Sequence, residues 1–211
     1  MPIAVLIEEG RRRTFASALD WPGWSRSATT RDDALVALDA YRDRYGGVLA
    51  ASRLDGPIGA LRVKEVLAGD ATTDFGAPSA IADADDRALR AADRERHAAI
   101  LVACWSRLDV VASSSPKLRP GPRGGGRDLA TVQRHVTEAE VAYARGLGLR
   151  VSATNGDPEL VEALRERVLG VLARTVTPER DGRWPLRYAV RRIAWHVCDH
   201  LFEIEDRAIA P

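Results

Sequence analysis

The chain of 211 residues has little of several features that mark specialised classes of protein. Its two cysteines, Cys104 and Cys198, fall at apolar positions of predicted helices, which favours buried reduced thiols over a disulfide framework. It has no run of eighteen apolar residues, and its start, MPIAVLIEEG, lacks the basic region and long apolar core of a signal peptide. We therefore expect a soluble, cytoplasmic protein with no membrane partner.

Positive and negative charges nearly balance, with 31 basic and 30 acidic residues and a formal net charge of +1. Such a balance gives no overall attraction to nucleic acid or to an acidic membrane surface. What the chain does have is 45% apolar residues in periodic patterns, enough to bury a core in one large domain or two small ones.

The pattern predicts an α+β protein whose two parts differ in their periodicity. In residues 1–68, alternating and turn-forming residues predict a small β-β-β-α-β domain, with a helix from Arg31 to Tyr45 that Thr29 or Thr30 caps. The predicted strands cover residues 2–9, 13–19, 25–28 and 60–67. Residues 69–82 are rich in turn formers and are predicted to be a linker. From residue 83 to 211 the pattern is helical, which predicts an up-down four-helix bundle.

The first part carries a short motif. Asp20, Trp21, Pro22 and Gly23 match a D-x-P-G turn, and Thr30 to Ala34 match a T-x-x-[DE]-A helix start. With the strand pair ahead of it, this segment resembles the HicB antitoxin family over about residues 2–67. The resemblance implies a degenerate double-stranded RNA-binding fold that masks a small toxin ribonuclease.

The composition of this segment bears on what it binds. The toxin's activity relies on a histidine, whereas no histidine precedes His97, so the resemblance does not extend to the ribonuclease. Residues 1–67 hold 10 basic and 9 acidic side chains with no clear basic face, and nucleic acid is therefore not the favoured partner. We expect an interaction or dimerisation module, since a small sheet exposes edges that need covering. A homodimer through the sheet or through the bundle is left open.

Two histidines stand out on the last predicted helix. His196 and His200 lie one turn apart on an apolar stripe, at the spacing that lets one helix offer two imidazoles to a metal ion. His135 is a third histidine on a core-facing stripe, that of the helix predicted over 129–147. The alternative is that all are satisfied core histidines. His97, at the upstream end of the helix predicted over 86–112, is interpreted as a structural histidine.

Charged residues near these stripes suggest supporting roles. Glu138 lies one turn from His135 and is the predicted carboxylate partner of the site. Asp199 and Glu203 turn away from the stripe, and neither is assigned as a base. Arg123 and Arg127 belong to a glycine-rich, cationic loop over 113–127 that could hold an anion, although a plain connecting loop would look much the same. Cys198 points about 160° from His196 and is not expected to join the same ion.

At these residues the segment from Asp83 to Ala210 resembles the DinB-like superfamily of metal-binding four-helix bundles. That superfamily includes mycothiol-dependent maleylpyruvate isomerase and the bacillithiol and mycothiol S-transferases. Its pattern is a histidine on the second helix, matched by His135 in QRHVTEAE, and an [HE]-x-x-x-H pair on the last helix, matched by His196 and His200. The resemblance implies that these three residues are ligands of a divalent metal such as Zn²⁺ or Ni²⁺.

Three imidazoles leave a coordination position open, in which a water or a thiol becomes more acidic. The expected function is a metal-dependent enzyme of the DinB-like class, transferring a low-molecular-weight, mycothiol-like thiol to an electrophilic small molecule. The alternative is a non-catalytic, metal-binding scaffold whose HicB-like module mediates protein interaction or dimerisation.

Overall fold

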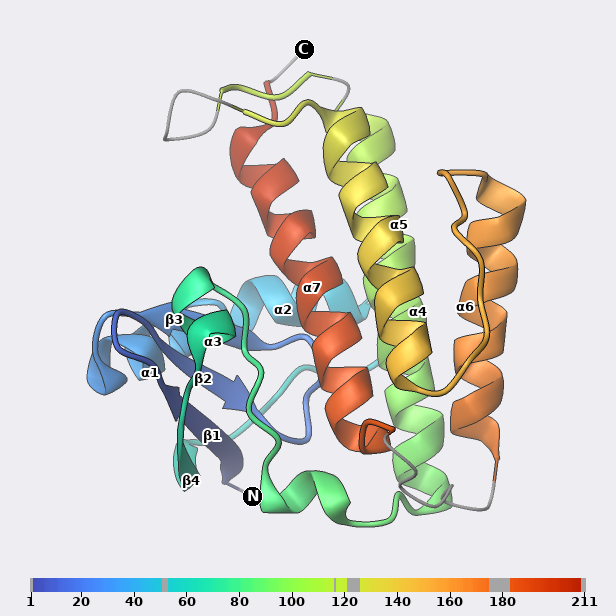
Figure 1. Cartoon of the computed structure of the whole chain (residues 1–211). Helices are drawn as coiled ribbons and strands as arrows, with labels where there is room; N and C mark the ends of the chain where they lie inside the picture. Colours follow the sequence, from blue (N-terminus) through green and yellow to red (C-terminus); the bar gives the residue numbers. More distant parts are fainter. Residues whose placement is uncertain (1, 51–52, 116, 121–125, 175–182, 210–211) are drawn as a thin grey trace.

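The computed structural model describes residues 2–50, 53–115, 117–120, 126–174 and 183–209. A four-stranded sheet in the order β3-β2-β1-β4 forms its first part (Figure 1). The strands are β1 (Ile3–Glu9), β2 (Thr14–Ala18), β3 (Ser25–Ala28) and β4 (Leu61–Ala68). β1 and β2 form the predicted antiparallel hairpin, whereas β4 lies parallel to β1 at the edge of the sheet.

Two helices, α1 (Arg31–Ala40) and α2 (Arg42–Ala50), occupy the place of the single predicted helix. Thr30 caps α1 by accepting a hydrogen bond from the backbone N–H of Asp33. The helical path breaks at Tyr41, whose ring packs against Phe202 with ring centres 5.4 Å apart. Beyond the break, Tyr45 is fully buried, stacks on Trp24 and donates its hydroxyl to Pro22 O. Tertiary contacts of the two tyrosines thus accompany the change of helix axis.

The second part consists of four long helices, α4 (Ala91–Ser114), α5 (Leu129–Gly146), α6 (Pro158–Ala173) and α7 (Leu186–Arg207). Asp128 and Asp157 cap α5 and α6 through their side chains. α4 and α7 run in the same direction. Two ion pairs show this, since Arg187 pairs with Asp93 near their starts and Arg107 pairs with Glu205 near their ends. The segment 147–157 travels back along the bundle, so that α6 repeats the direction of α5 (Figure 1). The α+β class with a small sheet followed by helices is confirmed, whereas the predicted up-down order of the four helices is wrong, because the long segment 147–157 returns the chain before α6 begins.

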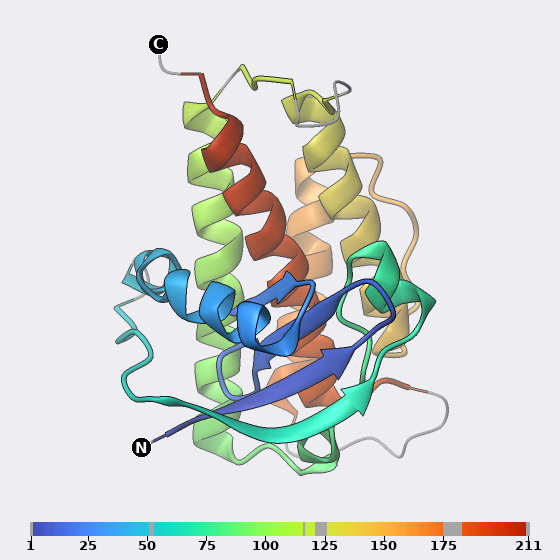
Figure 2. The ribbon, with the colours of Figure 1, turned by 90° about the vertical axis from the view of Figure 1, so that its left-hand side faces the viewer.

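The sheet lies across the bundle at α4 and α7 (Figure 2). One continuous cluster of buried apolar side chains includes Trp24 and Tyr45 from the first part and Cys104 and Leu201 from the bundle. The predicted boundary at residue 83 therefore separates the two parts along the chain but not in the core, and the division into two domains stays a prediction. None of the helices among the described residues is both long and apolar enough to cross a membrane.

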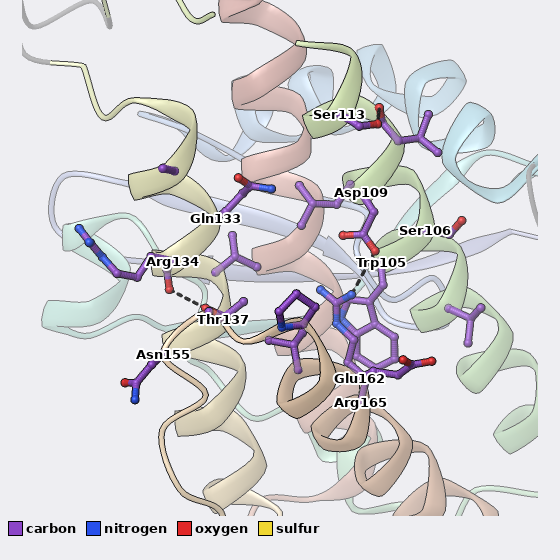
Figure 3. Close-up of a pocket in the computed structure, with 18 residues that line it drawn as sticks. Trp105, Ser106, Asp109, Ser113, Gln133, Arg134, Thr137, Asn155, Glu162 and Arg165 are labelled. Atoms are coloured by element: carbon purple, nitrogen blue, oxygen red, sulfur yellow. Dashed lines mark hydrogen bonds and ion pairs between the residues drawn. The ribbon is translucent and has the colours of Figure 1, made fainter. Parts of the chain in front are cut away.

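A cleft of about 1020 Å³ opens between α4, α5 and α6 (Figure 3). Its lining mixes the Trp105 ring with polar side chains such as Gln133, Asn155 and Arg165. The guanidinium of Arg165 pairs with Asp109 and with the buried Glu140, so the most buried charges of the cleft are satisfied by the protein itself. His135, His196 and His200 are not among its lining residues.

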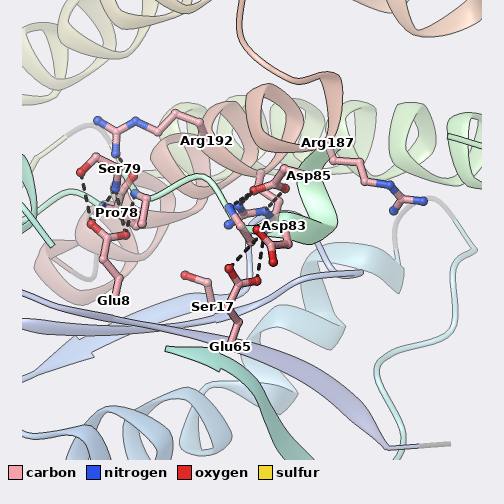
Figure 4. Close-up of polar contacts among 12 residues, drawn as sticks. Glu8, Ser17, Glu65, Pro78, Ser79, Asp83, Asp85, Arg187 and Arg192 are labelled. Atoms are coloured by element: carbon pink, nitrogen blue, oxygen red, sulfur yellow. Dashed lines mark hydrogen bonds and ion pairs between the residues drawn. The ribbon is translucent and has the colours of Figure 1, made fainter. Parts of the chain in front are cut away.

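The predicted linker is fixed between the sheet and α7 (Figure 4). It contains the short helix α3 (Ala71–Phe75), which the sequence pattern did not predict, and leads into a 3-10 turn, η1 (Asp83–Asp86). The buried Glu8 of β1 accepts hydrogen bonds from the backbone N–H groups of Ser79 and Ala80. Arg191 of α7 forms a buried ion pair with Asp85. Because both buried carboxylates are partnered, removing a partner of either would be costly.

Candidate metal centre

His135, His196 and His200 meet between α5 and α7. The stripe that each helix buries brings them together, and one nitrogen from each imidazole lies within 4.8 Å of the others. His196 and His200 are buried, and His135 is half-buried. The predicted convergence of three imidazoles from distant parts of the chain is therefore found, and the cluster could hold a metal ion.

The spacing of the nitrogens fits a metal ion. The Nε2 atoms of His135 and His196 are 3.2 Å apart. Zinc forms bonds of about 2.0–2.1 Å to histidine nitrogen, so two ligands at a tetrahedral angle lie about 3.3 Å apart. Without an ion the same contact is a hydrogen bond from one imidazole to the other. The nitrogens of His135 and His196 fit a divalent ion as they stand, and the His200 nitrogen, within 4.8 Å of both, would complete a set of three by moving closer.

Burial keeps the imidazoles in the neutral form that metal ions require. Burial, and then the neighbouring His200 and His135, lowers the pKa of His196 to about 2. Burial and the nearby His200 also lower the pKa of His135. The charges of Arg192 and Arg127 act in the same direction on His196. At neutral pH these two imidazoles are therefore uncharged and have a lone pair to offer.

Glu203 orients His200. Its Oε2 lies 2.8 Å from His200 Nδ1, and its Oε1 accepts a hydrogen bond from Arg207. The hydrogen bond from His200 and the contact with Arg207 lower the pKa of Glu203 to about 2, so the carboxylate can only accept. His200 Nδ1 consequently carries the proton, and its Nε2 is left free to bind a metal.

The carboxylate partner is not the predicted one. Glu203 was predicted to turn away from the stripe, but three residues along a helix bring a side chain back to within about 60° of the first. Glu138, the predicted partner, is exposed, and within the described part of the chain no hydrogen bond joins it to His135. Its charge only raises the pKa of His135 from a distance. The H-x-x-E spacing of His200 and Glu203 was the overlooked signal.

Arg207 connects this carboxylate to the loop after α4. Its guanidinium donates to the backbone carbonyls of Arg119, at 3.0 Å, and Arg127, at 2.7 Å. The backbone N–H of Arg119 returns a hydrogen bond to Arg207 O at 2.7 Å. Arg127 is thereby held near the histidines, and its predicted role in anion binding stays a prediction. Arg123 lies outside the described residues.

Two aromatic rings and one arginine form a wall beside His196. Tyr143 and Trp195 each meet the His196 ring edge to face, with ring centres 5.6 and 5.9 Å away. The guanidinium carbon of Arg192 lies 5.4 Å from the centre of Tyr143 and 4.9 Å from that of Trp195. Arg192 was not among the predicted site residues, although its position four residues before His196 puts it on the same face of the helix.

The remaining histidine and the cysteines stand apart from the cluster. His97 is 2% exposed and burial lowers its pKa to about 4, which agrees with a structural histidine. Cys104 and Cys198 are free, buried thiols whose sulfur atoms are 3.4 Å apart. The Nδ1 atoms of His97 and His196 are buried without a hydrogen-bond partner among the described residues.

Comparisons with models of protein families, with curated proteins and with solved structures found no match to this chain.

Proposed function

We propose that this protein is a metal-dependent enzyme of the DinB-like class. The proposal is supported above all by three imidazoles, drawn from two helices, whose nitrogens lie within 4.8 Å of one another. His135, His196 and His200 would hold the ion, and Zn²⁺ or Ni²⁺ suits a set of imidazole ligands. Closed structural zinc sites have four protein ligands, so a set of three is typical of a site that admits a further group.

The reaction we propose is transfer of a low-molecular-weight, mycothiol-like thiol to an electrophilic small molecule. A divalent ion, when bound, supplies Lewis acidity that makes a thiol in its remaining position more acidic. The protein's part is to keep the imidazoles of His135 and His196 neutral by burial and to fix His200 through Glu203 and Arg207. The choice of a thiol follows from the resemblance to the DinB-like superfamily. It adds a substrate class to a site whose geometry supports metal binding.

Metal analysis of the untagged protein, purified without chelators, tests the first step. We expect about one divalent ion per chain, as one three-ligand site implies. His196→Ala should remove it, whereas His97→Gln should retain it because His97 lies outside the cluster. Wild-type protein without stoichiometric metal would overturn the proposal.

A rate measurement tests the second step. The metal-loaded protein should accelerate consumption of a small thiol by an electrophile, and both chelation and His196→Ala should abolish the acceleration. Circular dichroism of the variant keeps loss of fold apart from loss of site. A metal-loaded protein that leaves the uncatalysed rate unchanged with a panel of thiols would refute the catalytic part alone.

A second candidate is a metal-stabilised scaffold whose HicB-like module mediates protein interaction or dimerisation. The observation favouring it is the shared core, in which the module covers α7 directly behind the histidine pair. A scaffold would lose thermal stability on chelation, show no thiol-consuming rate and form a defined homodimer or co-purify with a specific protein partner.

A further inference from the structure

Several positive side chains lie near the histidine cluster. Burial keeps His135 and His196 neutral, and among the described residues the carboxylate hydrogen-bonded to the cluster, that of Glu203, is already paired with Arg207. A divalent ion would therefore add two positive charges that no ligand compensates. Arg192 and Arg127 lie close enough to lower the pKa of His196 further. Such a site favours a ligand that is itself anionic.

Arg192 differs from the other arginines of α7. Each of the others is paired with a carboxylate: Arg187 with Asp93, Arg191 with Asp85, and Arg207 with Glu203. Within the described part of the chain, Arg192 has no carboxylate at ion-pair distance, and its hydrogen bond goes to the neutral Pro78 O. Figure 4 shows it reaching toward Pro78 and Ser79, where Glu8 is engaged by backbone N–H groups.

The surroundings of Arg192 suit a bound anion. Its guanidinium lies against the rings of Tyr143 and Trp195, and these same rings flank His196. The separation between its guanidinium carbon and the centre of the His196 ring cannot exceed the sum of 5.4 and 5.6 Å, the two legs through Tyr143. A small molecule can span that distance. Its guanidinium presents further N–H donors in a plane, the geometry that a carboxylate accepts.

We infer that Arg192 is a specificity residue that receives a carboxylate of the ligand entering the histidine cluster. The inference rests on the proposed function, because it takes the other end of that ligand to be a thiol at the metal. It assigns the ligand to a chemical class, small thiols that carry a carboxylate a few bonds from sulfur, in place of a thiol such as mycothiol, whose cysteine carboxyl is bound in an amide. It also places the anion site on the α7 wall, away from the loop that contains Arg127.

The test compares two thiols that differ in the carboxylate. Co²⁺-loaded protein is titrated with 3-mercaptopropionate and with 2-mercaptoethanol, and the sulfur-to-cobalt charge-transfer absorption reports binding. We expect 3-mercaptopropionate to bind about tenfold more tightly or better, as a charge-assisted hydrogen-bonded pair allows. Arg192→Gln should abolish this preference, so that the two thiols bind with similar affinity.

Two matched variants separate geometry from charge. Arg192→Lys keeps the charge but loses the planar fork, and should retain only part of the preference. Arg134→Gln removes an equal charge from an exposed position next to His135 and should keep all of it. The inference is overturned if Arg192→Gln still prefers the carboxylated thiol as the wild type does, or if Arg134→Gln loses the preference equally.

A failure of the proposed metal site can be told apart from a failure of the proposed carboxylate site. If stoichiometric Co²⁺ does not bind, the proposed function fails, and the carboxylate site is then measured on the metal-free protein. Trp195 lies 4.9 Å from the Arg192 guanidinium carbon, so its fluorescence should report the binding of succinate. An Arg192→Gln protein that binds succinate as tightly as the wild type, or a wild type that does not bind it, would then overturn the inference by itself.

Discussion

α7 presents two buried stripes that differ in chemistry. On one side Ala194, Cys198 and Phe202 face the N-terminal part, where Cys198 and Ala194 lie against Gly23, and Phe202 against Tyr41. On the other side His196 and His200 face α5. Residues two apart on a helix are about 200° apart, so the two stripes lie back to back.

The difference between the stripes shows how one helix can serve both stability and binding. Along the first stripe Gly23 has φ +97°, and a Cβ there would lie 2.9 Å from Cys198 Sγ, so the packing leaves no room for a ligand. Along the second, the Nε2 atoms of His196 and His135 lie 3.2 Å apart, at the spacing of two ligands of one ion. The first stripe is closed to a ligand, whereas the second has the donor atoms for one.

The largest effect should come from the apolar stripe. Phe202→Ala removes a side chain that is 4% exposed and that contacts the Tyr41 ring and the Arg44 guanidinium. We expect a loss of about 3–5 kcal/mol in the free energy of unfolding, measured by urea denaturation. The metal content of the folded variant should stay that of the wild type. A variant that keeps its stability but loses metal would show that the stripes are not independent.

Glu203→Gln should act on the other stripe alone. The amide is a weaker acceptor for His200 Nδ1 and for Arg207, so we expect metal affinity to fall by about 10- to 100-fold. Competition with a chromogenic chelator measures the change. Glu138→Gln is the matched control, because Glu138 is exposed, and it should leave the affinity nearly unchanged. Equal losses in both variants would contradict the assignment of Glu203.

Counted per histidine and per pH unit, the smallest effect is the pH dependence of the stability of the metal-free protein. His196 and His97 have folded-state pKa values of about 2 and about 4, below the ordinary 6.5. The unfolded chain therefore binds more protons, and stability is full above pH 6.5 and falls as the pH is lowered. Each histidine contributes about 1.4 kcal/mol per pH unit between 6.5 and about 4.5.

Comparison with His196→Ala isolates the contribution of His196 to this pH dependence of stability. Without chelatable metal, the wild-type slope should exceed that of the variant by about 1.4 kcal/mol per pH unit. Urea denaturation at several pH values measures both slopes. Identical slopes would mean that His196 is not held neutral by its surroundings.

Local periodicity explains which parts of the site the sequence could predict. His196 and His200 lie on one face of a helix because they are four residues apart, and Val132, His135 and Val136 repeat the same relation on α5. The hairpin of β1 and β2 likewise follows from alternation around a turn. The break at Tyr41 was not predicted, because its visible causes are a ring contact with Phe202, 161 residues later, and the burial of Tyr45.

The roles of charged residues were harder to predict, because they depend on partners from other elements. Arg191 and Arg192 are neighbours in sequence, yet one pairs with Asp85 and the other has only a carbonyl. The order of the linker was not predicted because it comes from contacts of Thr73, Pro78 and Ser79 with the distant residues Glu8 and Arg192. Glu203 was missed for a different reason, since its proximity to His200 is a matter of helical angle alone.

By itself, the amino-acid sequence determined the α+β class, the helices that carry the three histidines and the faces on which those histidines lie. These depend on interactions within a few residues, which a single chain segment already specifies. Only the tertiary structure decided that the histidines meet, that Glu203 and Arg207 hold one of them, and that Arg192 is left without a carboxylate. Those outcomes depend on how α5 and α7 pack and on which group from another element lies close enough to pair with each charged side chain.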